Sequence, residues 1–563
     1  MCGPENTSGR LQLAVLVCIT AAGISCSQLK FLKSPSVPKP RGDSLTVQGP
    51  AFGVAPSSAP DPTADWSTYN RTFTGDRYAP FDGITTANVD GLRPECSYKL
   101  DQKVTFQTGP LEIGGTIFFT TAASTYAIDA SSCALRWKHD YEYQPKPDFD
   151  LGVNRGLAYL DGKLFRGSND GRVYALDAAT GRELWNVVAG NVRKGETFPA
   201  ATIAWNGLVF IGNAGGDNFG VVGRMMAFDV NTGGRVWSVD LVARNDSAAG
   251  SWPPSTEIIP RAGGATWTSY TLDTLSGTLY VPTGNAAPDF LSAARPGDNL
   301  HTTSIVEIDS RLGTITGWHQ LVERDIHDWD VSAAPVLITT KEGRKLIVAG
   351  GKDGHVNGIE RKSGKRLYRT AVTRIENVDA PLTEDGTRFC PGVNGGVEWN
   401  GPTYLPVTNA VYVNAIEWCT TIKVGPVAKL EGKDGLPWTG SSELKHPFGV
   451  QDSAWAGYLT ALDADDGSVR WQFKAPTPLV AGVTATKGGL IFTADLKGTV
   501  YGFDAKNGAI LYRYEAGQPV GGGVISYEAG GRQFVAVAAG MHAPGTWKLE
   551  SEPARLLVFA LSR

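Results

Sequence analysis

The chain has 563 residues, of which 42% are hydrophobic and 19% are charged, with 68 glycines and only four methionines. This composition is typical of a large core built from many short strands and turns. The 52 basic and 56 acidic side chains give a net charge of −4 without a basic tract. That balance argues against nucleic acid or an anionic membrane surface as a partner and favours small or neutral ligands.

The first 26 residues predict an export signal, because Arg10 precedes an apolar run over 11–24 and small residues stand before Cys26. Cleavage directly before Cys26 would give a lipid anchor, but the Leu usual three positions before such a cysteine is absent. Simple secretion and lipidation therefore both stay open. Residues 27–64, rich in Pro and Ser, predict a disordered tether, and we expect one folded unit over 65–563. The expected location is periplasmic, secreted or lipid-anchored.

Export makes disulfide bonds possible, so the four cysteines after residue 26 are interpreted as two pairs rather than as metal ligands. Sequential pairing is expected, Cys96 with Cys133 and Cys390 with Cys419. The sequence has no C-x-x-C-H motif, which argues against a covalently attached c-type haem.

One signature recurs seven times along the chain. An apolar strand ends in Asp or Glu, a turn with Gly in most copies follows, and an aromatic residue opens the next strand. In six copies the acid and the aromatic are eight residues apart, and in the copy at 306–318 they are nine apart. The copies are YAIDASSCALRW (126–137), YALDAATGRELW (174–185), MAFDVNTGGRVW (226–237), VEIDSRLGTITGW (306–318), NGIERKSGKRLY (357–368), TALDADDGSVRW (460–471) and YGFDAKNGAILY (501–512).

This repeat predicts the blades of a β-propeller, with the aromatic residue packed between neighbouring blades. A β-sandwich with similar hairpins is the alternative, and seven copies along the chain argue against it. An eighth blade can form from the C-terminal strand at 555–562 and an N-terminal segment near 65–70, which would close the ring. Long gaps between Asp229 and Asp309 and between Glu360 and Asp463 predict extra loops, where function is expected.

Several motifs outside the repeat follow one another in the order of a known family. They are DWSTYNRTFTGDRYAPFDGITTANVDGL (65–92), VNRGLAY (153–159), TWTSYTLD (266–273), PTGNAAP (282–288), RPGDNLHTTSI (295–305), HDWDVSAAPVL (327–337), GGKDG (350–354), CPGVNGG (390–396) and VTATKGGLIFTADLKG (483–498). Over nearly all of 65–563, the chain resembles the quinoprotein alcohol dehydrogenases, which use pyrroloquinoline quinone (PQQ). The resemblance implies an all-β, eight-bladed β-propeller of the quinoprotein alcohol dehydrogenase type.

PQQ is a flat ortho-quinone with three carboxylates, so its site needs an aromatic platform, cations and a metal ion. The resemblance implies that Trp267 is the platform and that Arg155 and Lys352 contact the carboxylate and carbonyl oxygens of the quinone. Gln107 stands where the family has a quinone-contacting Glu, and its amide can still form a hydrogen bond. The alternatives are a blade-packing tryptophan and solvated surface charges.

For the metal ion, the resemblance implies the ligands Asp217, Asn285 and Asp328, whose hard oxygens suit calcium. Asp217 departs from the usual Glu and follows a one-residue insertion, and Asn285 has a turn-forming role as its alternative. Asp328 is also the expected catalytic base. Asp330 stands where some relatives carry an extra acid associated with lanthanide use, and capping of a strand end is its alternative. Calcium and a lanthanide both stay open.

Two departures affect the expected quinone site. Phe149 and Asp150 replace a Cys-Cys pair that often lies over the quinone in the family. Phe149 is expected to supply the second face of the site, whereas Asp150 beside an anionic cofactor is unfavourable unless it is paired. Val222 stands where many relatives carry Arg.

Three functions stay open from the sequence. The first is a periplasmic PQQ-dependent dehydrogenase that oxidises an alcohol and passes electrons to an external cytochrome c-type carrier. The second is a non-catalytic scaffold, as in the outer-membrane assembly lipoproteins that share such blades. The third keeps the cofactor but oxidises a polyol, a sugar or a polymeric alcohol. The joint presence of R-P-G-D-N, T-G-N, Lys352 and Asp328 favours an enzyme.

Overall fold

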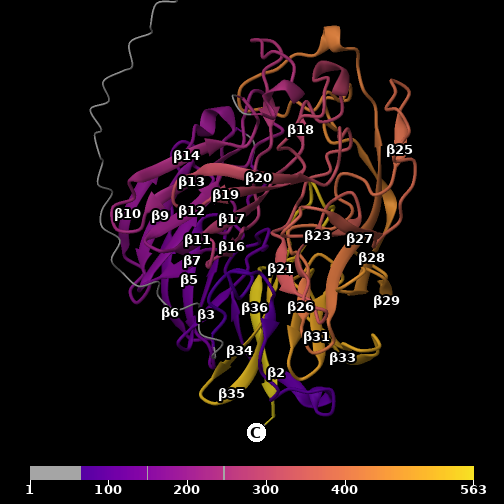
Figure 1. Cartoon of the computed structure of the whole chain (residues 1–563). Helices are drawn as coiled ribbons and strands as arrows, with labels where there is room; N and C mark the ends of the chain where they lie inside the picture. The colour runs from indigo at the N-terminus through magenta and orange to yellow at the C-terminus, as the bar shows by residue number, and fades with distance from the viewer. Residues whose placement is uncertain (1–64, 149, 245–246, 563) are drawn as a thin grey trace, which may run out of the picture. The chain divides into compact units, whose positions relative to one another are not determined.

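The computed structural model describes residues 65–148, 150–244 and 247–562 (Figure 1). The export signal and tether predicted over residues 1–64 lie outside this range. Within it, the only helices are five short 3-10 turns, and none is long or apolar enough to cross a membrane. They are η1 (Val89–Gly91), η2 (Val192–Lys194), η3 (Ala249–Ser251), η4 (Ser292–Ala294) and η5 (Val427–Lys429).

The described residues form eight blades, each built on four antiparallel strands, which confirms the predicted all-β propeller. We number the blades in chain order. Blade 1 is β3 (Leu111–Ile113), β4 (Thr116–Thr120), β5 (Ser124–Asp129) and β6 (Leu135–Asp140). Blade 2 is β7 (Ala158–Leu160), β8 (Lys163–Gly167), β9 (Arg172–Asp177) and β10 (Glu183–Val188). Blade 3 is β11 (Ile203–Trp205), β12 (Leu208–Gly212), β13 (Arg224–Asp229) and β14 (Arg235–Asp240).

The next three blades follow the same order. Blade 4 is β16 (Thr271–Asp273), β17 (Thr278–Pro282), β19 (Ser304–Asp309) and β20 (Thr314–Gln320). Blade 5 is β21 (Val336–Thr339), β22 (Lys345–Gly350), β23 (His355–Glu360) and β24 (Arg366–Ala371). Blade 6 is β26 (Thr403–Leu405), β27 (Ala410–Ile422), β28 (Val450–Asp463) and β29 (Val469–Ala475), and β25 (Thr387–Phe389) pairs with the far end of β27.

Blades 7 and 8 complete the ring. Blade 7 is β30 (Thr484–Thr486), β31 (Leu490–Ala494), β32 (Thr499–Asp504) and β33 (Ile510–Glu515), with β1 (Tyr78–Ala79) added in parallel beside β30. Blade 8 is β34 (Val524–Ala529), β35 (Arg532–Ala539), β36 (Arg555–Leu561) and β2 (Leu92–Lys99).

Strand burial follows the position of each strand in its blade. In blade 1, every residue of β4 (TIFFT) is buried, because the inner strands are covered on both faces by neighbouring blades. The outermost strand, β6 (LRWKHD), alternates exposed and half-buried residues. One apolar cluster joins Phe165 of blade 2, Phe210 of blade 3 and Leu279 of blade 4, so the core runs between the blades.

The repeat forms the turn between the third and fourth strands of a blade. In blade 2, Asp177 accepts hydrogen bonds from the backbone N–H groups of Ala179 and Thr180, which fixes the turn. A register shift in the fourth strand then places Trp185 opposite Ala175. The corresponding shift occurs in all seven blades that carry the repeat.

The tryptophan of one repeat docks onto the repeat of the next blade, which confirms the predicted packing between blades. Trp471 Nε1 donates a 3.0 Å hydrogen bond to the carbonyl oxygen of Ala505, directly after the acid of the next repeat. A Cβ added at Gly508 would lie 2.7 Å from the Trp471 ring, so this position admits only glycine. Trp137, Trp185 and Trp237 donate in the same way to Ala178, Val230 and Ser310.

Removing the contact between a repeat tryptophan and the next blade should lower the stability of the propeller. We expect Trp471→Ala to lower the free energy of unfolding by about 3 kcal/mol, because both the packing and the hydrogen bond are lost. Trp471→Phe keeps most of the packing and should cost only about 1 kcal/mol. Urea denaturation of the two variants measures the difference in their free energies of unfolding. Equal losses of stability would contradict the contribution that we assign to packing of the tryptophan ring.

The ring closes with a different N-terminal strand from the one predicted. The C-terminal strand β36 pairs with β35 and, on its other edge, with β2, so Leu561 lies opposite Leu92 (Figure 1). The expectation that residues near 65–70 fill this place is wrong, whereas closure by β36 is confirmed. The LRPECSYK sequence of β2 supplies a run of eight strand residues that can cover the whole edge of β36.

The segment 65–81 instead runs beside the first strands of several blades, close to the axis. Trp66 exchanges backbone hydrogen bonds with Glu112 of blade 1. Further along, the carbonyl oxygens of residues 73, 74, 76 and 77 accept hydrogen bonds from the first strands of blades 4, 5, 6 and 7. The Tyr69 hydroxyl donates to Asn400 Oδ1 at 3.1 Å. These bonds tie five blades to one segment.

Glu112 introduces a pH dependence into this region. Its side chain is 0% exposed, and burial, with the nearby charge of Asp65, raises its pKa from 4.5 to about 8. Between these pH values the unfolded chain releases a proton that the folded protein keeps, so the stability falls as the pH rises.

We therefore expect Glu112→Gln to raise the free energy of unfolding at pH 8 by about 2 kcal/mol relative to its effect at pH 4.5. The amide can still accept the hydrogen bond that the N–H of Gly115 donates to Glu112 Oε1. Urea denaturation of wild type and variant at both pH values measures this. A difference between the two proteins that does not change with pH would contradict the argument.

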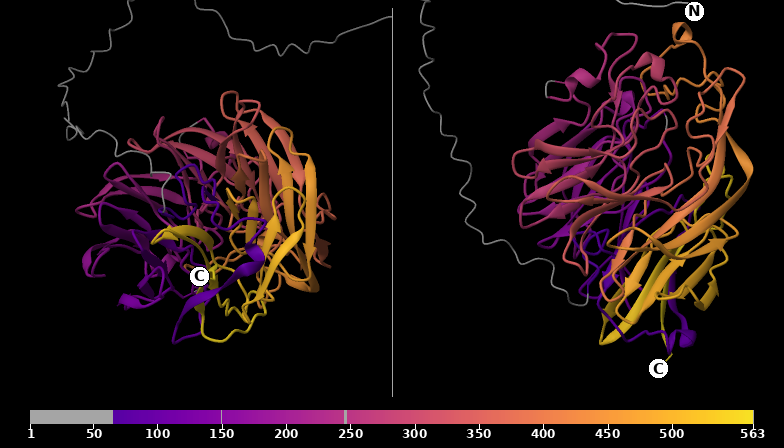
Figure 2. Two further views of the ribbon diagram at one scale, coloured as in Figure 1. Left: turned by 90° about the horizontal axis from the view of Figure 1, so that it is seen from below. Right: turned by 45° about the vertical axis from the view of Figure 1, so that its right-hand side comes forward.

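The long gaps between repeats hold additional loops, as predicted. They contain η3 and β15 (Ala262–Gly263) between blades 3 and 4, β18 (Ala286–Ala287) and η4 within blade 4, and β25 and η5 around blade 6. In Figure 1, β18 and β25 lie at the same end of the propeller, and the left view of Figure 2 shows the ring from below. Both predicted disulfide bonds are present, Cys96–Cys133 between blades 8 and 1, and Cys390–Cys419 between the end of β25 and β27.

Candidate active site at the propeller axis

The direction of the strands brings the predicted site residues to one face of the ring. Because strands alternate within a blade, the connections from strand 2 to strand 3 and from strand 4 to the next blade leave at the same face. Asn285 and Lys352 lie on connections of the first kind, and Arg155 and Trp267 lie on connections of the second kind. The turns of the repeat leave at the opposite face, so the repeat builds the scaffold and takes no part in the site.

One cavity contains all the predicted cofactor and metal residues that the structure describes. It is lined by Gln107, Arg155, Asp217, Trp267, Asn285, Asp328, Asp330 and Lys352. The volume of the cavity is about 190 Å³, more than ten times the roughly 15 Å³ that a single water molecule needs. The cavity therefore has room for an organic molecule. Phe149 lies outside the described residues, so its predicted place over the quinone is not described.

Trp267 forms an aromatic wall with two cations beside it. The guanidinium carbon of Arg155 lies 4.5 Å from the centre of the Trp267 ring, and Lys352 Nζ lies 5.6 Å from it. Arg155 also donates a 3.1 Å hydrogen bond to the carbonyl oxygen of Trp267. Both cations are at least nine-tenths buried, so their charge acts in a weakly screened environment.

Lys352 connects two of the predicted acids. Its Nζ lies 2.8 Å from Asp330 Oδ2 and 3.3 Å from Asp328 Oδ2. Asp330 is held further by Trp267 Nε1, which donates to Oδ2 at 3.1 Å, and by the N–H of Asn285, which donates to Oδ1 at 2.8 Å. Both oxygens of Asp330 are thus engaged by donors, whereas Asp328 receives a hydrogen bond only from Lys352 among the described residues.

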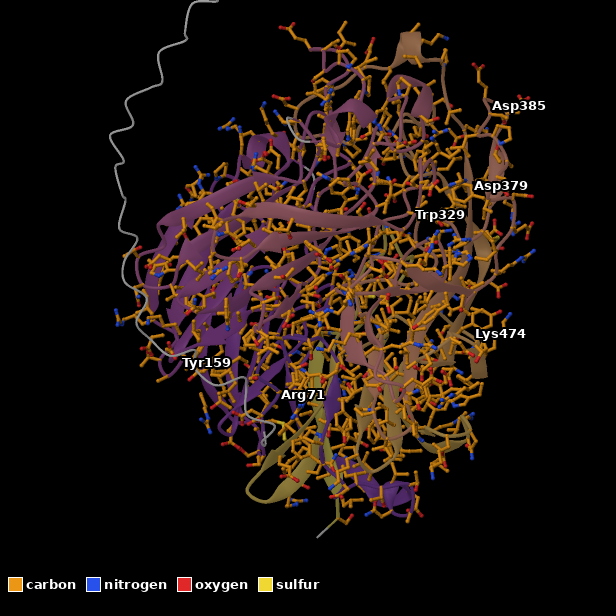
Figure 3. All side chains as sticks on the ribbon, viewed as in Figure 1. Arg71, Tyr159, Trp329, Asp379, Asp385 and Lys474 are labelled. Atoms are coloured by element: carbon orange, nitrogen blue, oxygen red, sulfur yellow. A yellow bond between two sulfur atoms is a disulfide. The ribbon has the colours of Figure 1, made fainter. Side chains whose placement is uncertain are left out.

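The loop that carries Asp328 is clamped on both sides of that residue. The rings of His327 and Trp329 stack with centres 4.0 Å apart (Trp329 is labelled in Figure 3). The Asp325 carboxylate accepts hydrogen bonds from the backbone N–H groups of both residues. Asp328 itself has a φ of 63°, in the left-handed region that is costly for a residue other than glycine. The clamp holds this conformation, and burial lowers the pKa of His327 to about 3, so its ring is neutral.

Burial raises the pKa values of two acids of the cavity, and neighbouring charges modify this shift. Burial, together with the charge of Asp330, raises the pKa of Asp217 to about 6, while Lys352 acts to lower it. Burial also raises the pKa of Asp328 well above its usual value, against the opposing effect of Lys352. For Lys352 the two carboxylates outweigh burial and hold its pKa well above the usual value.

Two acids of this region were missed by the sequence reasoning. Asp289 is 0% exposed, and one of its oxygens lies within 4.8 Å of one oxygen of Asp217 and one of Asp328. Glu398 lines the cavity near Lys352 and Arg155, and burial raises its pKa to about 7. A signal for Asp289 was its position four residues after Asn285, within the same extra loop. The sequence offers no comparable signal for Glu398, which lies between two blades.

Two residues that depart from the family pattern, Asp150 and Val222, have other partners close by. Asp150 lines the cavity, and its Oδ1 accepts hydrogen bonds from the N–H of Gly152 at 2.9 Å and from Asn169 Nδ2 at 2.7 Å. It is thus paired with amides and not with a cation, and burial raises its pKa. Val222 is buried and forms a bridge with Gly263, outside the cavity wall.

The cavity suits a flat, anionic cofactor and a metal ion. Gln107 Oε1 and Arg155 Nε are buried and have no hydrogen-bond partner within the described part of the chain, so polar groups are available to a ligand. A Cβ added at Gly284 would lie 2.6 Å from Asp330 Oδ1, so the backbone itself forms part of the wall. The lining has five carboxylates but only two cationic side chains, a charge balance that calls for a cation. Fold and site together define a cofactor-binding propeller of the quinoprotein class.

Comparison with known proteins agrees with this class. A family model described as glucose/ethanol/alcohol dehydrogenase, β-propeller domain, matches residues 66–381. A second model, described as outer membrane protein assembly factor BamB, matches residues 456–550. The dehydrogenase subunit of a quinone-type alcohol dehydrogenase from Gluconacetobacter polyoxogenes is 31% identical over 551 residues, covering 87% of this chain and 73% of that protein.

Two further relatives cover most of the chain. The lanthanide-dependent methanol dehydrogenase of Methylacidiphilum fumariolicum is 27% identical, covering 86% of this chain and 85% of that protein. The solved structure of the quinohemoprotein alcohol dehydrogenase ADHIIG from Pseudomonas putida HK5 has a TM-score of 0.79 at 26% identity, covering 88% of this chain and 80% of that one. The chain belongs to the PQQ-dependent alcohol dehydrogenase family and is an oxidoreductase of that type.

Proposed function

We propose that this protein is a periplasmic, PQQ-dependent dehydrogenase that oxidises an alcohol and passes the electrons to an external cytochrome c-type carrier. The observation that supports it most is the single cavity in which Trp267, Lys352 and Asp328 converge from different blades. An aromatic wall, a buried cation and an acid with a raised pKa are what a quinone-dependent alcohol oxidation requires. The export signal predicted over residues 1–26 supports the periplasmic location.

Each residue of the cavity has its own role in this proposal. Trp267 stacks on the ring system of the cofactor, and Arg155 and Gln107 bind its polar edge. Asp217, Asn285 and Asp328 hold a metal ion. Bound PQQ supplies a quinone carbonyl, polarised by that ion, which accepts a hydride. Lys352 lies beside Asp330 and stabilises negative charge at the quinone oxygens.

Asp328 acts as the base in this proposal. Its carboxylate takes the proton of the alcohol hydroxyl while the hydride leaves the adjacent carbon. Burial raises the pKa of Asp328, which makes its carboxylate a stronger base, and the positive charges of Lys352 and of a bound metal ion oppose this shift. Asp330 is less suited to this role, because donors already occupy both of its oxygens.

A scaffold function would need none of these groups. Burying several carboxylates around one lysine costs stability, and a protein that only presents a surface gains nothing from this cost. This cost, together with the relation to alcohol dehydrogenases, favours an enzyme over a scaffold. Oxidation of a polyol, a sugar or a polymeric alcohol uses the same residues and differs from the first proposal only in the substrate.

The test is reconstitution of the purified chain with PQQ and either CaCl₂ or LaCl₃. We expect one PQQ bound per chain, detected by its absorbance and by quenching of tryptophan fluorescence, and dye-linked oxidation of simple alcohols. A screen of alcohols, polyols and sugars then distinguishes the substrate classes. Absence of PQQ binding with both metals would contradict the proposal and favour a scaffold.

A further inference from the structure

Asp289 is a buried acid without a structural partner. It follows β18 in the extra loop of blade 4 and is 0% exposed. Neither of its carboxylate oxygens has a hydrogen-bond partner among the described residues. The neighbouring Arg295 donates to the backbone carbonyl of Asp289 at 2.8 Å and to Asn299, and leaves the side chain without a donor. An unpaired buried carboxylate is strongly destabilising, so its presence calls for a ligand.

The carboxylate of Asp289 lies close to two acids that line the cavity. One oxygen each from Asp217, Asp289 and Asp328 lie within 4.8 Å of one another. Two oxygens on opposite sides of an ion with metal–oxygen distances of 2.3–2.6 Å would be about 5 Å apart. The three side chains thus have the spacing of ligands around one cation. They come from blade 3, blade 4 and the connection between blades 4 and 5, so the tertiary fold and not local sequence brings them together.

Asp330, which the sequence offered as an extra metal ligand or as a cap of a strand end, is bound in a different way. Lys352, Trp267 and the N–H of Asn285 satisfy its two oxygens. A metal ion that bound Asp330 would compete with these donors for the carboxylate charge and would lie near the ammonium group of Lys352. Asp289 has no such competition.

We propose that Asp289 is a ligand of the metal ion, together with Asp217 and Asp328, and that the site binds a trivalent lanthanide ion more tightly than calcium. Three carboxylates carry three negative charges, which a trivalent ion neutralises and a divalent ion does not. Asp330 then serves to position Lys352 and Trp267. The use of the ion in catalysis rests on the proposed function, but its binding to these residues does not.

Terbium titration of the purified, metal-free chain tests the proposal. Tryptophans of the cavity, such as Trp267, sensitise the luminescence of bound Tb³⁺, and competition with CaCl₂ gives the preference between the ions. We expect one Tb³⁺ per chain and an affinity for Ca²⁺ at least about 100-fold weaker. Asp289→Asn should weaken Tb³⁺ binding by at least about 30-fold and reduce the preference over Ca²⁺.

Asp150→Asn is the matched control. It removes one negative charge from the same cavity wall, outside the three-carboxylate cluster, and should change the Tb³⁺ affinity by less than about threefold. Asp330→Asn should weaken binding less than Asp289→Asn does. The metal-free Asp289→Asn protein should melt close to the wild-type temperature or above it, because the carboxyl group has no hydrogen bond among the described residues that the substitution would remove. This result would show that weaker binding does not come from misfolding.

Several outcomes would overturn the inference: no Tb³⁺ binding by the wild type, wild-type affinity in Asp289→Asn, or a larger loss in Asp330→Asn than in Asp289→Asn. PQQ binding, followed by absorbance in the same samples, separates the two proposals. If PQQ binds but Asp289→Asn behaves as wild type, the metal assignment fails and the proposed function stands. If no PQQ binds but Asp289→Asn loses Tb³⁺, the assignment stands and the proposed function fails.

Discussion

Asp328→Asn should lower kcat by about 10²–10⁴-fold, because the variant has no carboxylate to take the proton of the alcohol. The amide has nearly the same shape, so PQQ should remain bound when the metal ion is saturating. Steady-state kinetics with dye-linked alcohol oxidation measures kcat, and absorbance of the protein measures the bound quinone. Metal analysis of the same samples separates loss of the base from loss of the ion.

Asp325→Asn is the control for this variant. Asp325 lies in the same loop and holds the backbone of His327 and Trp329, but it does not line the cavity. Its substitution should lower the melting temperature, and kcat should fall less than in Asp328→Asn, because position 328 keeps its carboxylate. The role of Asp328 would be refuted by a nearly normal kcat in Asp328→Asn, and a loss in Asp330→Asn alone would assign the base to Asp330.

Lys352→Met should destabilise the protein by about 3–5 kcal/mol near pH 8, because it leaves two buried carboxylates without their cation. The loss should be smaller at pH 5. Without Lys352 the pKa of Asp328 rises further, so the folded protein binds more protons than the unfolded chain, and its stability falls as the pH rises. Affinity for PQQ should fall as well, since the cation beside Trp267 is lost.

Denaturation at pH 5 and pH 8, with Lys352→Arg alongside, measures this effect. The arginine keeps the positive charge and should recover part of the stability at pH 8 and part of the affinity for PQQ. A loss of stability that is the same at both pH values would show that packing of the lysine chain, and not its charge, is responsible.

The propeller could be predicted from the sequence because its construction is local and repeated. Each repeat contains its own turn, with an acid that binds backbone N–H groups and an aromatic residue that docks on the next blade, as Asp177 and Trp185 do. Ring closure is not local, since β2 and β36 are more than 450 residues apart along the chain. The prediction therefore found β36 and chose the wrong N-terminal partner, because the segment 65–81 carries no signal that it runs along the axis.

The site was predicted through family motifs, residue by residue, and the structure brings the described members into one cavity. Motifs name the residues but not their hydrogen-bond partners. They could not show that Asp330 is occupied by Lys352 and Trp267, or that Asp289 faces Asp217 and Asp328. Glu398 was missed for the same reason, because only its burial between Lys352 and Arg155 distinguishes it from an ordinary acid.

The sequence by itself thus determined the blades, the disulfide pairs and most residues of the site, because a turn, a cysteine pair or a motif keeps its chemistry in a short stretch of chain. Only the tertiary structure decided which strand closes the ring. It also decided which acids lie beside the lysine and which acids are placed to bind a metal ion. These depend on distances between side chains from different blades. Such distances are set when the closed ring brings its connections together at the axis.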